Sequence, residues 1–323
     1  MVKRKTALLV SYNGSAFKGS QLQNTDVRTV ERDLEQALYE AGCIAPSNHG
    51  NLSKVNWSRA SRTDKGVHAL CTVFAMKMLY DERPTERLLE DINSRLNSDI
   101  RLIGLRLVVD KFDAKKLSSY REYEYLFPYQ ALMLERTLDE SVVQELNKIA
   151  SKFQGTHKFH NYTRKLKMGD PQAKRYIVKF EALEPIQHNQ VPFLRFKLTG
   201  QSFLYHQIRK MIAMTLGVFL EHFSLDAIQE SFESENYFVP LAPAEGLMLS
   251  QISFVHYNRK NTHRPIAIGA QEEQQMQEFL ETNLLPEIYS HYPTFLKFGT
   301  DLKSGNLRDY DDDTSKPSKK AES

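Results

Sequence analysis

The chain has 323 residues, of which 41% are hydrophobic, so it can bury the core of one large domain or of two ordinary ones. A formal net charge of +3 allows a nucleic-acid partner without requiring one. Two cysteines, Cys43 and Cys71, are too few for a disulfide framework, and no apolar run approaches the roughly 20 residues that cross a bilayer. We therefore expect a protein of the nucleus or cytoplasm, with an organelle still open, and no membrane partner.

Apolar periodicity in the first third of the chain predicts alternating strands and helices. A buried strand ends at the turn residues Asn13 and Gly14. Thr29 is the expected N-cap of a helix, although Arg32 stands where a capping box has glutamate. The elements expected here are a strand at 6–12, a helix at 29–42, a strand at 67–78, a helix at 84–96 and a strand at 102–109.

The same order recurs loosely further along. The elements expected there are a strand at 120–128, a helix at 139–153, strands at 175–183 and 192–198, a helix at 203–223 and a strand at 248–255. This alternation predicts an α+β fold built from two similar sheet-and-helix halves. We place the halves at 1–110 and 111–260. Residues 261–323 are expected to hold a peripheral helix at 271–280, ended before Pro286, and a disordered charged tail.

The segment "WSRASRTDKGVHAL", residues 57–70, places one carboxylate, Asp64, among several cations. Charge alone favours a solvated surface turn with an ordinary salt bridge. Gly66 allows the backbone to approach a ligand closely, and Arg62 can reach either the acid or a phosphate. A strand with apolar neighbours follows at once, which is typical of a functional loop held by a rigid scaffold. Both interpretations stay open on this segment alone.

Two further segments carry candidate residues. In "GQSFLYHQIRKMIAM", residues 200–214, a continuous helix would place Arg209 beside Tyr205 on an apolar flank. Arg209 then either reaches along that flank to solvent or pairs with a buried carboxylate. In "SYREYEYLFP", Tyr123 and Tyr125 have strand spacing and face one side of the sheet. They are either packing residues or a platform for an unstacked base.

Other motifs predict no cofactor and no metal. His157 and His160 have a spacing found in metal sites, but no third ligand is evident nearby. His206 is expected to pack or to contact a phosphate rather than to transfer protons. The chain has no glycine-rich phosphate loop, dinucleotide-binding fingerprint or nucleophile elbow. The candidate chemistry therefore depends on one acid, two arginines and a tyrosine.

Together these motifs resemble the TruA-type tRNA pseudouridine synthases, and within that family they are closest to the eukaryotic Pus1-like branch. The motifs occur in the family's order across Lys5 to Tyr257, and they are "SYNGSAFKGSQLQ", "SRTDKGVHA", "FDAKKLSSYREYEYLFP", "SFLYHQIRKM" and "LAPAEGLML". Two positions depart from the pattern. Ser20 stands where a bulky residue is usual and Asn97 where proline is common. Ser20 is expected to alter how RNA packs against that turn.

The resemblance implies an isomerase that converts uridine in tRNA to pseudouridine in a cleft between the two halves, with small nuclear or messenger RNA as further candidate substrates. It implies that Asp64 is the catalytic carboxylate, that Arg209 keeps it ionised, and that Tyr123 stacks on the uracil. Arg62 would displace the target nucleotide or hold its phosphate. The remaining residues expected to bind RNA are Arg59, Lys65, His68, Lys165, Lys167, Tyr205, His206 and Lys210.

No protein partner is identifiable from the sequence. The alternative of another class is an RNA-binding protein on the same scaffold that has lost catalysis. The presence of Asp64, Arg62, Tyr123 and Arg209 together argues against it. A carboxylate hydrolase that acts on small molecules would need a second acid, and none accompanies Asp64 in these motifs.

Overall fold

A computed structural model of the chain describes residues 2–23, 27–81, 83–164 and 166–306. Lys165 and the charged tail at 307–323 lie outside the described residues. The strands are β1 (Val2–Tyr12), β2 (Ser58–Arg59), β3 (His68–Tyr80), β4 (Ile100–Leu107), β5 (Tyr120–Pro128), β6 (Gly155–Lys158), β7 (Lys174–His188), β8 (Val191–Gly200) and β9 (Leu247–Ser253). The helices are α1 (Val30–Glu40), α2 (Thr85–Asn93), α3 (Ala114–Leu117), α4 (Glu140–Ala150), α5 (Gln207–Phe219), α6 (Ala227–Glu233), α7 (Val255–Lys260), α8 (Ala270–Phe279), α9 (Leu285–Ser290) and α10 (Tyr292–Ser304).

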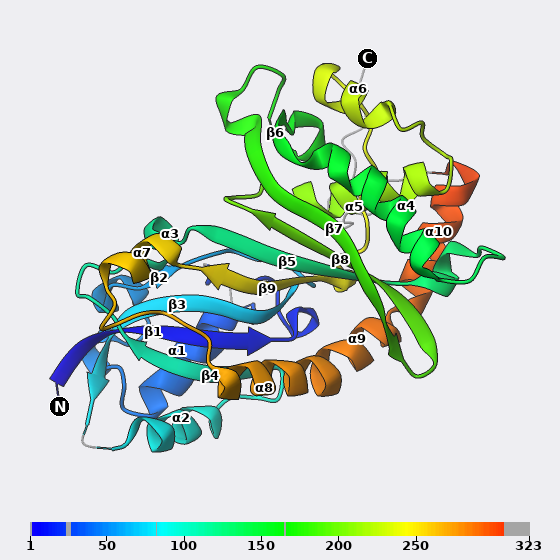
Figure 1. Cartoon of the computed structure of the whole chain (residues 1–323). Helices are drawn as coiled ribbons and strands as arrows, with labels where there is room; N and C mark the ends of the chain where they lie inside the picture. Colours follow the sequence, from blue (N-terminus) through cyan, green and yellow to red (C-terminus); the bar gives the residue numbers. More distant parts are fainter. Residues whose placement is uncertain (1, 24–26, 82, 165, 307–323) are drawn as a thin grey trace, which may run out of the picture.

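Within the described residues, the strands form one nine-stranded sheet, and the predicted α+β class is confirmed. The strand order is β4-β1-β3-β9-β5-β8-β7-β6, with β2 paired to the side of β3. Figure 1 shows how β9, which comes late in the chain, lies between β3 and β5. This strand therefore joins the sheet of the N-terminal half to that of the C-terminal half. The predicted boundaries at 110 and 260 stay a prediction.

The pairing at this junction sets the position of the site. β3 and β9 run parallel over a short stretch, in which His68 pairs with Met248 and Ala69 with Leu249. Leu249 in turn pairs antiparallel with Tyr123 of β5. Because neighbouring strands lie about 4.8 Å apart, the start of β3 is only about 10 Å from Tyr123. The turn that carries Asp64 precedes β3 directly, so strand pairing brings the acid to the tyrosine.

Helices cover the sheet at both ends. α4 packs on β7 and on α5, while α8 contacts β3 and β4, and α10 contacts β5. The Thr29 side chain accepts a hydrogen bond from the Arg32 main-chain nitrogen, so the predicted N-cap of α1 is confirmed. The sheet and the helices that cover it enclose a single core, since the buried apolar side chains of both halves form one connected cluster.

The region after Tyr257 is more closely integrated than the sequence suggested. α8 continues through a π-helical turn, Leu280–Leu284, into α9, and α10 follows. Phe295 and Phe298 of α10 are buried against Phe127, with ring centroids 5.4 and 6.0 Å apart. The prediction missed α9 and α10 because it took Pro286 as a helix end. Pro286 lies in the first turn of α9, and a second proline lies in the first turn of α10. At such a position the missing proline N–H removes no intrahelical hydrogen bond, so proline is compatible with a helix start.

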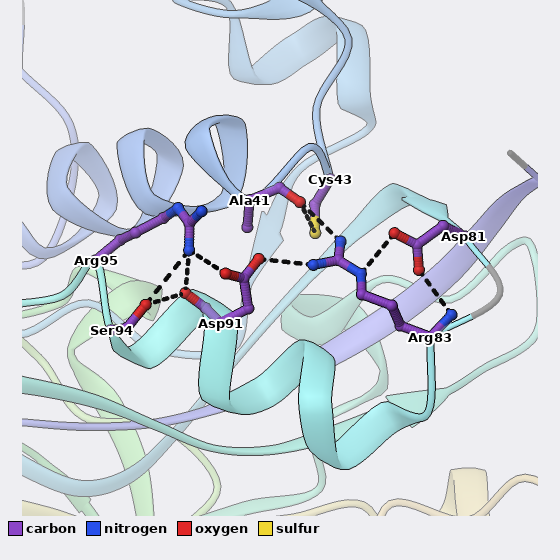
Figure 2. Close-up of polar contacts among 7 residues, drawn as sticks. All are labelled: Ala41, Cys43, Asp81, Arg83, Asp91, Ser94 and Arg95. Carbon is purple, nitrogen blue, oxygen red and sulfur yellow. Dashed lines mark hydrogen bonds and ion pairs between the residues drawn. The ribbon is translucent and has the colours of Figure 1, made fainter.

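An arginine network joins α1, α2 and the end of β3 away from the junction (Figure 2). Arg83 donates to Asp81 at 2.6 Å, to Asp91 at 2.7 Å and to the carbonyl oxygen of Ala41 at 3.0 Å. Arg95 binds the other side of Asp91. The nearby Cys43 thiol is buried, which raises its pKa to about 12, and burial has the same effect on Cys71. Both cysteines are free, and their thiols are kept in the unreactive protonated form.

Candidate active site

A cavity of about 490 Å³ lies at the junction of the two halves, and we call it the active pocket. It collects side chains from three segments that are far apart in sequence. Arg62 and Asp64 come from the turn before β3, Tyr123 comes from β5, and Arg209 comes from α5. The other lining residues used below are Arg59, Ser61, Arg121, Phe203, Tyr205 and His206. The four residues expected to perform the chemistry thus line one cavity.

The turn that carries Asp64 is held by buried hydrogen bonds on its inner side. The hydroxyl groups of Thr63 and Tyr12 lie 2.6 Å apart, and the Thr63 main-chain N–H donates to Ser20 Oγ at 3.0 Å. Gly66 has a φ of +80°, a conformation that favours glycine, and a Cβ there would lie 3.3 Å from the Cβ of Ala244. The backbone of the turn is therefore fixed while Asp64 lines the pocket.

Ser20 has a structural role that the sequence did not indicate. Its side chain is buried and accepts the Thr63 N–H, a contact that a bulky apolar residue could not make. Ser20 therefore supports the backbone of the turn that carries Asp64. It also lines the groove beside this turn, and its expected effect on RNA packing stays a prediction.

Tyr123 is buried in the wall of the pocket. Its hydroxyl lies 3.0 Å from Ser61 Oγ, and its ring packs edge-on against Phe203 with centroids 5.3 Å apart. Burial raises the pKa of Tyr123, and the negative charge of Asp64 acts in the same direction, so the phenol stays protonated at neutral pH. Tyr125 is fully buried and donates to the carbonyl oxygen of Pro243 at 2.9 Å. Tyr125 is thus a packing residue.

Arg209 enters the pocket from the first turn of α5. Its side chain is only 3% exposed, and Nε donates to the carbonyl oxygen of Ala242 at 2.6 Å. Its charge also lowers the pKa of the buried Tyr125, although the desolvation that raises this pKa is larger. Arg209 therefore supplies positive charge from a fixed, poorly hydrated position, where charge acts more strongly than at the surface.

The helix that carries Arg209 begins later than predicted. α5 starts at Gln207, because His206 has a φ of +67°, which a helix cannot contain. The prediction that Tyr205 and Arg209 lie side by side on one continuous helix is therefore wrong. Tyr205 instead projects from a loop, 49% exposed, and stacks on His206 with ring centroids 3.7 Å apart. Burial and the charges of Arg209, Arg164 and Lys210 lower the pKa of His206 to about 3, so this imidazole is neutral.

Two residues expected to bind RNA, Arg59 and His68, make contacts within the protein. The Arg59 guanidinium forms a two-pronged salt bridge with the buried carboxylate of Glu31, which also accepts from Trp57 Nε1 at 2.8 Å. His68 is fully buried: its Nδ1 accepts from the Gly14 N–H, and its Nε2 donates to the Glu245 carbonyl oxygen, both at 2.9 Å. These contacts correct the expectation for His68, whose ring has no surface to offer to RNA, and they turn Arg59 toward Glu31.

Lys65 and Lys210 lie beside the active pocket rather than in its wall. Lys65 lines an adjoining groove of about 420 Å³ that shares Arg62, Asp64 and Tyr205 with the pocket and also includes Lys18. Lys210 is largely buried, and its Nζ donates to the carbonyl oxygen of Asn161 at 3.1 Å. Lys167 and Lys210 both line a further cavity, separate from the active pocket and the groove.

Sequence reasoning missed the residue that connects these segments. Arg121 lines the pocket and donates to the carbonyl oxygens of Ala60 at 2.8 Å and Gln201 at 2.5 Å and to Ser118 Oγ at 2.7 Å. Ser61, beside Ala60, holds the Tyr123 hydroxyl. The available signal was strand spacing, because Arg121 and Tyr123 are two residues apart on β5 and share a face.

The two histidines with metal-like spacing have separate contacts. The His157 ring stacks on Phe232 with centroids 4.3 Å apart, and His160 Nε2 lies 2.8 Å from the Ser234 carbonyl oxygen. In the part of the chain that the structure describes, no three His, Cys, Asp or Glu side chains group as they would to hold a metal ion. Nor does any helix in that part combine the length and apolar character needed to cross a membrane.

Comparisons with known proteins show which family the chain belongs to. A family model described as tRNA pseudouridine synthase matches residues 149–255. The pseudouridylate synthase 1 homolog of Mus musculus is 36% identical over 304 residues, which cover 89% of this chain and 70% of the mouse protein. The Homo sapiens homolog is 35% identical over 297 residues, or 87% and 68% of the two chains. The tRNA pseudouridine synthase 1 of Candida albicans is 27% identical over 391 residues, or 89% and 63%. The chain therefore belongs to the TruA-type tRNA pseudouridine synthase family, and it is an isomerase that converts uridine to pseudouridine.

Proposed function

We propose that this protein isomerises uridines in tRNA, with Asp64 as the catalytic carboxylate acting on a base turned out of its stack. The observation that carries the proposal is the convergence of Arg62, Asp64, Tyr123 and Arg209 on one pocket. The names of the fungal relatives support tRNA as the substrate. Small nuclear and messenger RNA are secondary candidates.

The size of the pocket supports a turned-out nucleotide. Its volume of about 490 Å³ falls in the range of small-molecule sites. A uridine inside a helix would keep its glycosidic bond out of reach of a buried wall residue such as Tyr123. Enzymes that act on bases pay the unstacking cost and bind the extruded base in such a pocket.

The reaction itself needs a negative group near the sugar or the base. The N1–C1′ bond breaks, the uracil turns, a C5–C1′ bond forms, and the C5 proton is lost while N1 gains one, so no atoms are gained or lost overall. The Asp64 carboxylate either forms a bond to the base or sugar or stabilises an oxocarbenium-like or glycal species. Both roles require the ionised form, which the positive charge of Arg209 at the same pocket favours.

Tyr123 can help to remove the C5 proton only as a relay that passes a proton on. Its raised pKa keeps the phenol protonated, so its oxygen can take the C5 proton only while releasing its own. The Ser61 hydroxyl, 3.0 Å away and partly exposed, can receive that proton while it releases its own to solvent. We propose that Ser61 and Tyr123 act together in this step.

Arg62 borders both the active pocket and the adjoining groove. From there its guanidinium can contact the phosphate of the target nucleotide or fill the space that the base leaves. Lys18 and Lys65 in the groove would neutralise neighbouring phosphates. Binding should therefore weaken as salt is raised.

The test uses Asp64→Asn, which keeps the size of the side chain and removes its charge. We expect no detectable release of tritium from tRNA labelled at uridine C5, while the Kd for tRNA stays within about threefold of wild type. Asp110→Asn, at an exposed position after β4, is the matched control and should retain full activity. Turnover by Asp64→Asn at the wild-type rate would refute the assignment.

The inactive RNA-binding alternative gives a different result, because the wild type itself would then release no tritium. Mapping pseudouridine in total RNA with and without the protein identifies the target positions. We also propose a nuclear or cytoplasmic place of action, supported by the two free cysteines. Cell fractionation tests this, and recovery in mitochondria or in the secretory pathway would contradict it.

A further inference from the structure

A second cavity of about 460 Å³ lies beside the first turn of α5, and we call it the lateral pocket. Lys210 lines it, whereas the preceding residue, Arg209, lines the active pocket. Most of the remaining wall comes from two loops, of which the lining residues are Thr163, Leu166, Lys167 and Met168 in the first and 235–239 in the second. The two cavities are therefore separated by little more than one turn of helix.

The wall of the lateral pocket combines apolar surface with positive charge. Phe238 is 51% exposed and Met168 is 43% exposed, which is high for large apolar side chains beside a cavity. Lys167 is exposed and forms no ion pair with any residue that the structure describes. Glu235 also lines the pocket, so the two lysines outnumber the acid. An aromatic face beside cations suits a base with its phosphate.

A buried ring nitrogen in the wall has no partner. His160 is only 3% exposed, and its Nε2 lies 2.8 Å from the Ser234 carbonyl oxygen and 3.1 Å from Asn161 Nδ2, so it can donate to the first or accept from the second. Whichever nitrogen carries the proton, Nδ1 has no hydrogen-bond partner among the described residues. A buried polar atom without a partner is costly. A ribose hydroxyl in the pocket, which can donate or accept, would provide one after a small movement of the wall.

Arg164 follows Thr163, which lines the lateral pocket. Burial does most to lower the pKa of His206 in the active pocket, and the charges of Arg209 and then of Arg164 lower it further. Three residues further along the chain, Lys167 reaches the lateral pocket. Turning a uridine out of its stack also displaces its neighbours in the strand, which then need a place to bind.

We propose that the lateral pocket binds an unpaired nucleotide of the substrate RNA that flanks the target uridine, with its base on Phe238 and its phosphate near Lys167 and Lys210. This inference rests on the proposed function and adds a substrate requirement to it. Modified uridines would then lie beside a nucleotide that can leave its helix.

The first test compares steady-state kinetics on a tRNA transcript. Phe238→Ala should raise KM about tenfold, because one stacked base is lost, with kcat within twofold of wild type. Tyr176→Ala is the matched control, since Tyr176 is 48% exposed on β7 and lines neither cavity. An unchanged KM in Phe238→Ala would overturn the subsite.

Lys167→Ala tests the phosphate contact. It should reduce the slope of log Kd against log salt concentration by about 0.7, the value for one contact to a single strand. Lys148→Ala, an exposed lysine on α4, should leave the slope unchanged. Equal slopes for Lys167→Ala and wild type would contradict a phosphate at this position.

A binding test separates this proposal from the proposed function. RNAs with 2-aminopurine at each position next to the target are bound to Asp64→Asn protein, which should bind without turnover. We expect one position to be quenched by stacking and the quenching to be lost in the Asp64→Asn, Phe238→Ala double variant. Quenching that survives in the double variant overturns the subsite even where the wild type makes pseudouridine. Absence of pseudouridine with Phe238-dependent quenching would refute the proposed catalysis alone.

Discussion

The guanidinium of Arg121 donates a hydrogen bond to the main-chain carbonyl oxygen of Ala60, 61 residues earlier in the chain, at 2.8 Å. The same guanidinium binds the carbonyl oxygen of Gln201, which precedes α5. Arg121 thus ties the segment that carries Asp64 and the segment that leads to Arg209 to the strand that carries Tyr123. Together with the strand pairing, Arg121 therefore helps to fix the relative positions of the three proposed catalytic side chains.

Arg121→Ala should lower kcat about 100-fold, with KM changed less than threefold, because a misplacement of about 1 Å costs a rate of this order. Arg121→Lys should recover part of the loss, since an ammonium can reach one of the carbonyl oxygens but not hold all three partners. The measurement is steady-state tritium release from labelled tRNA.

Arg83→Ala is the control for that experiment, because Arg83 also holds several partners but lies in the network of Figure 2, away from the pocket. Its activity should stay within twofold of wild type, and Tm should fall by only a few degrees. Equal losses of kcat in the Arg83 and Arg121 variants would show a general effect on folding instead of positioning.

Arg209→Lys should reduce the single-turnover rate at least 100-fold while the Kd for tRNA stays within about threefold. Lysine keeps the positive charge, but it cannot both donate to the Ala242 carbonyl oxygen and present a second nitrogen to the pocket. Rapid-quench measurement with enzyme in excess isolates this step. A wild-type rate would remove Arg209 from the mechanism.

Glu31→Ala should lower the free energy of unfolding by about 3 kcal/mol, because Arg59, Trp57 and the Leu22 N–H all lose their acceptor inside the protein. Urea unfolding followed by circular dichroism measures this. Trp57 is the single tryptophan of the chain, so its fluorescence reports directly on the change. Glu145→Ala breaks an exposed pair with Arg136 and should change stability by less than 1 kcal/mol.

The stability of the protein should depend on pH through His68. Burial lowers its pKa to about 4, so between pH 6.5 and 4 the unfolded chain binds a proton that the folded protein does not. The contribution is complete above pH 6.5 and is lost as pH falls to 4, by at most about 3 kcal/mol. His68→Asn keeps an acceptor for the Gly14 N–H but cannot titrate. Its free energy of unfolding should start lower at pH 7.5 and approach that of wild type as pH falls. Parallel curves would contradict this.

Much of the local structure could be read from the sequence. The strand 120–128 was predicted with its observed bounds, and Thr29 caps α1 as expected. The candidate residues Asp64, Tyr123 and Arg209 were also found from short motifs and resemblance. Periodicity and capping act between residues a few positions apart, so the sequence displays them directly.

The contacts that complete the site could not be read in this way. Arg59 meets Glu31 across 28 residues, and Arg121 meets Ala60 across 61. The left-handed conformation of His206, which delays the start of α5, has no signal in the apolar pattern. The sequence by itself predicted most of the elements and the candidate side chains. The pairing of β9 between β3 and β5 decided which of those side chains meet, because strand order brings together residues that no local pattern connects.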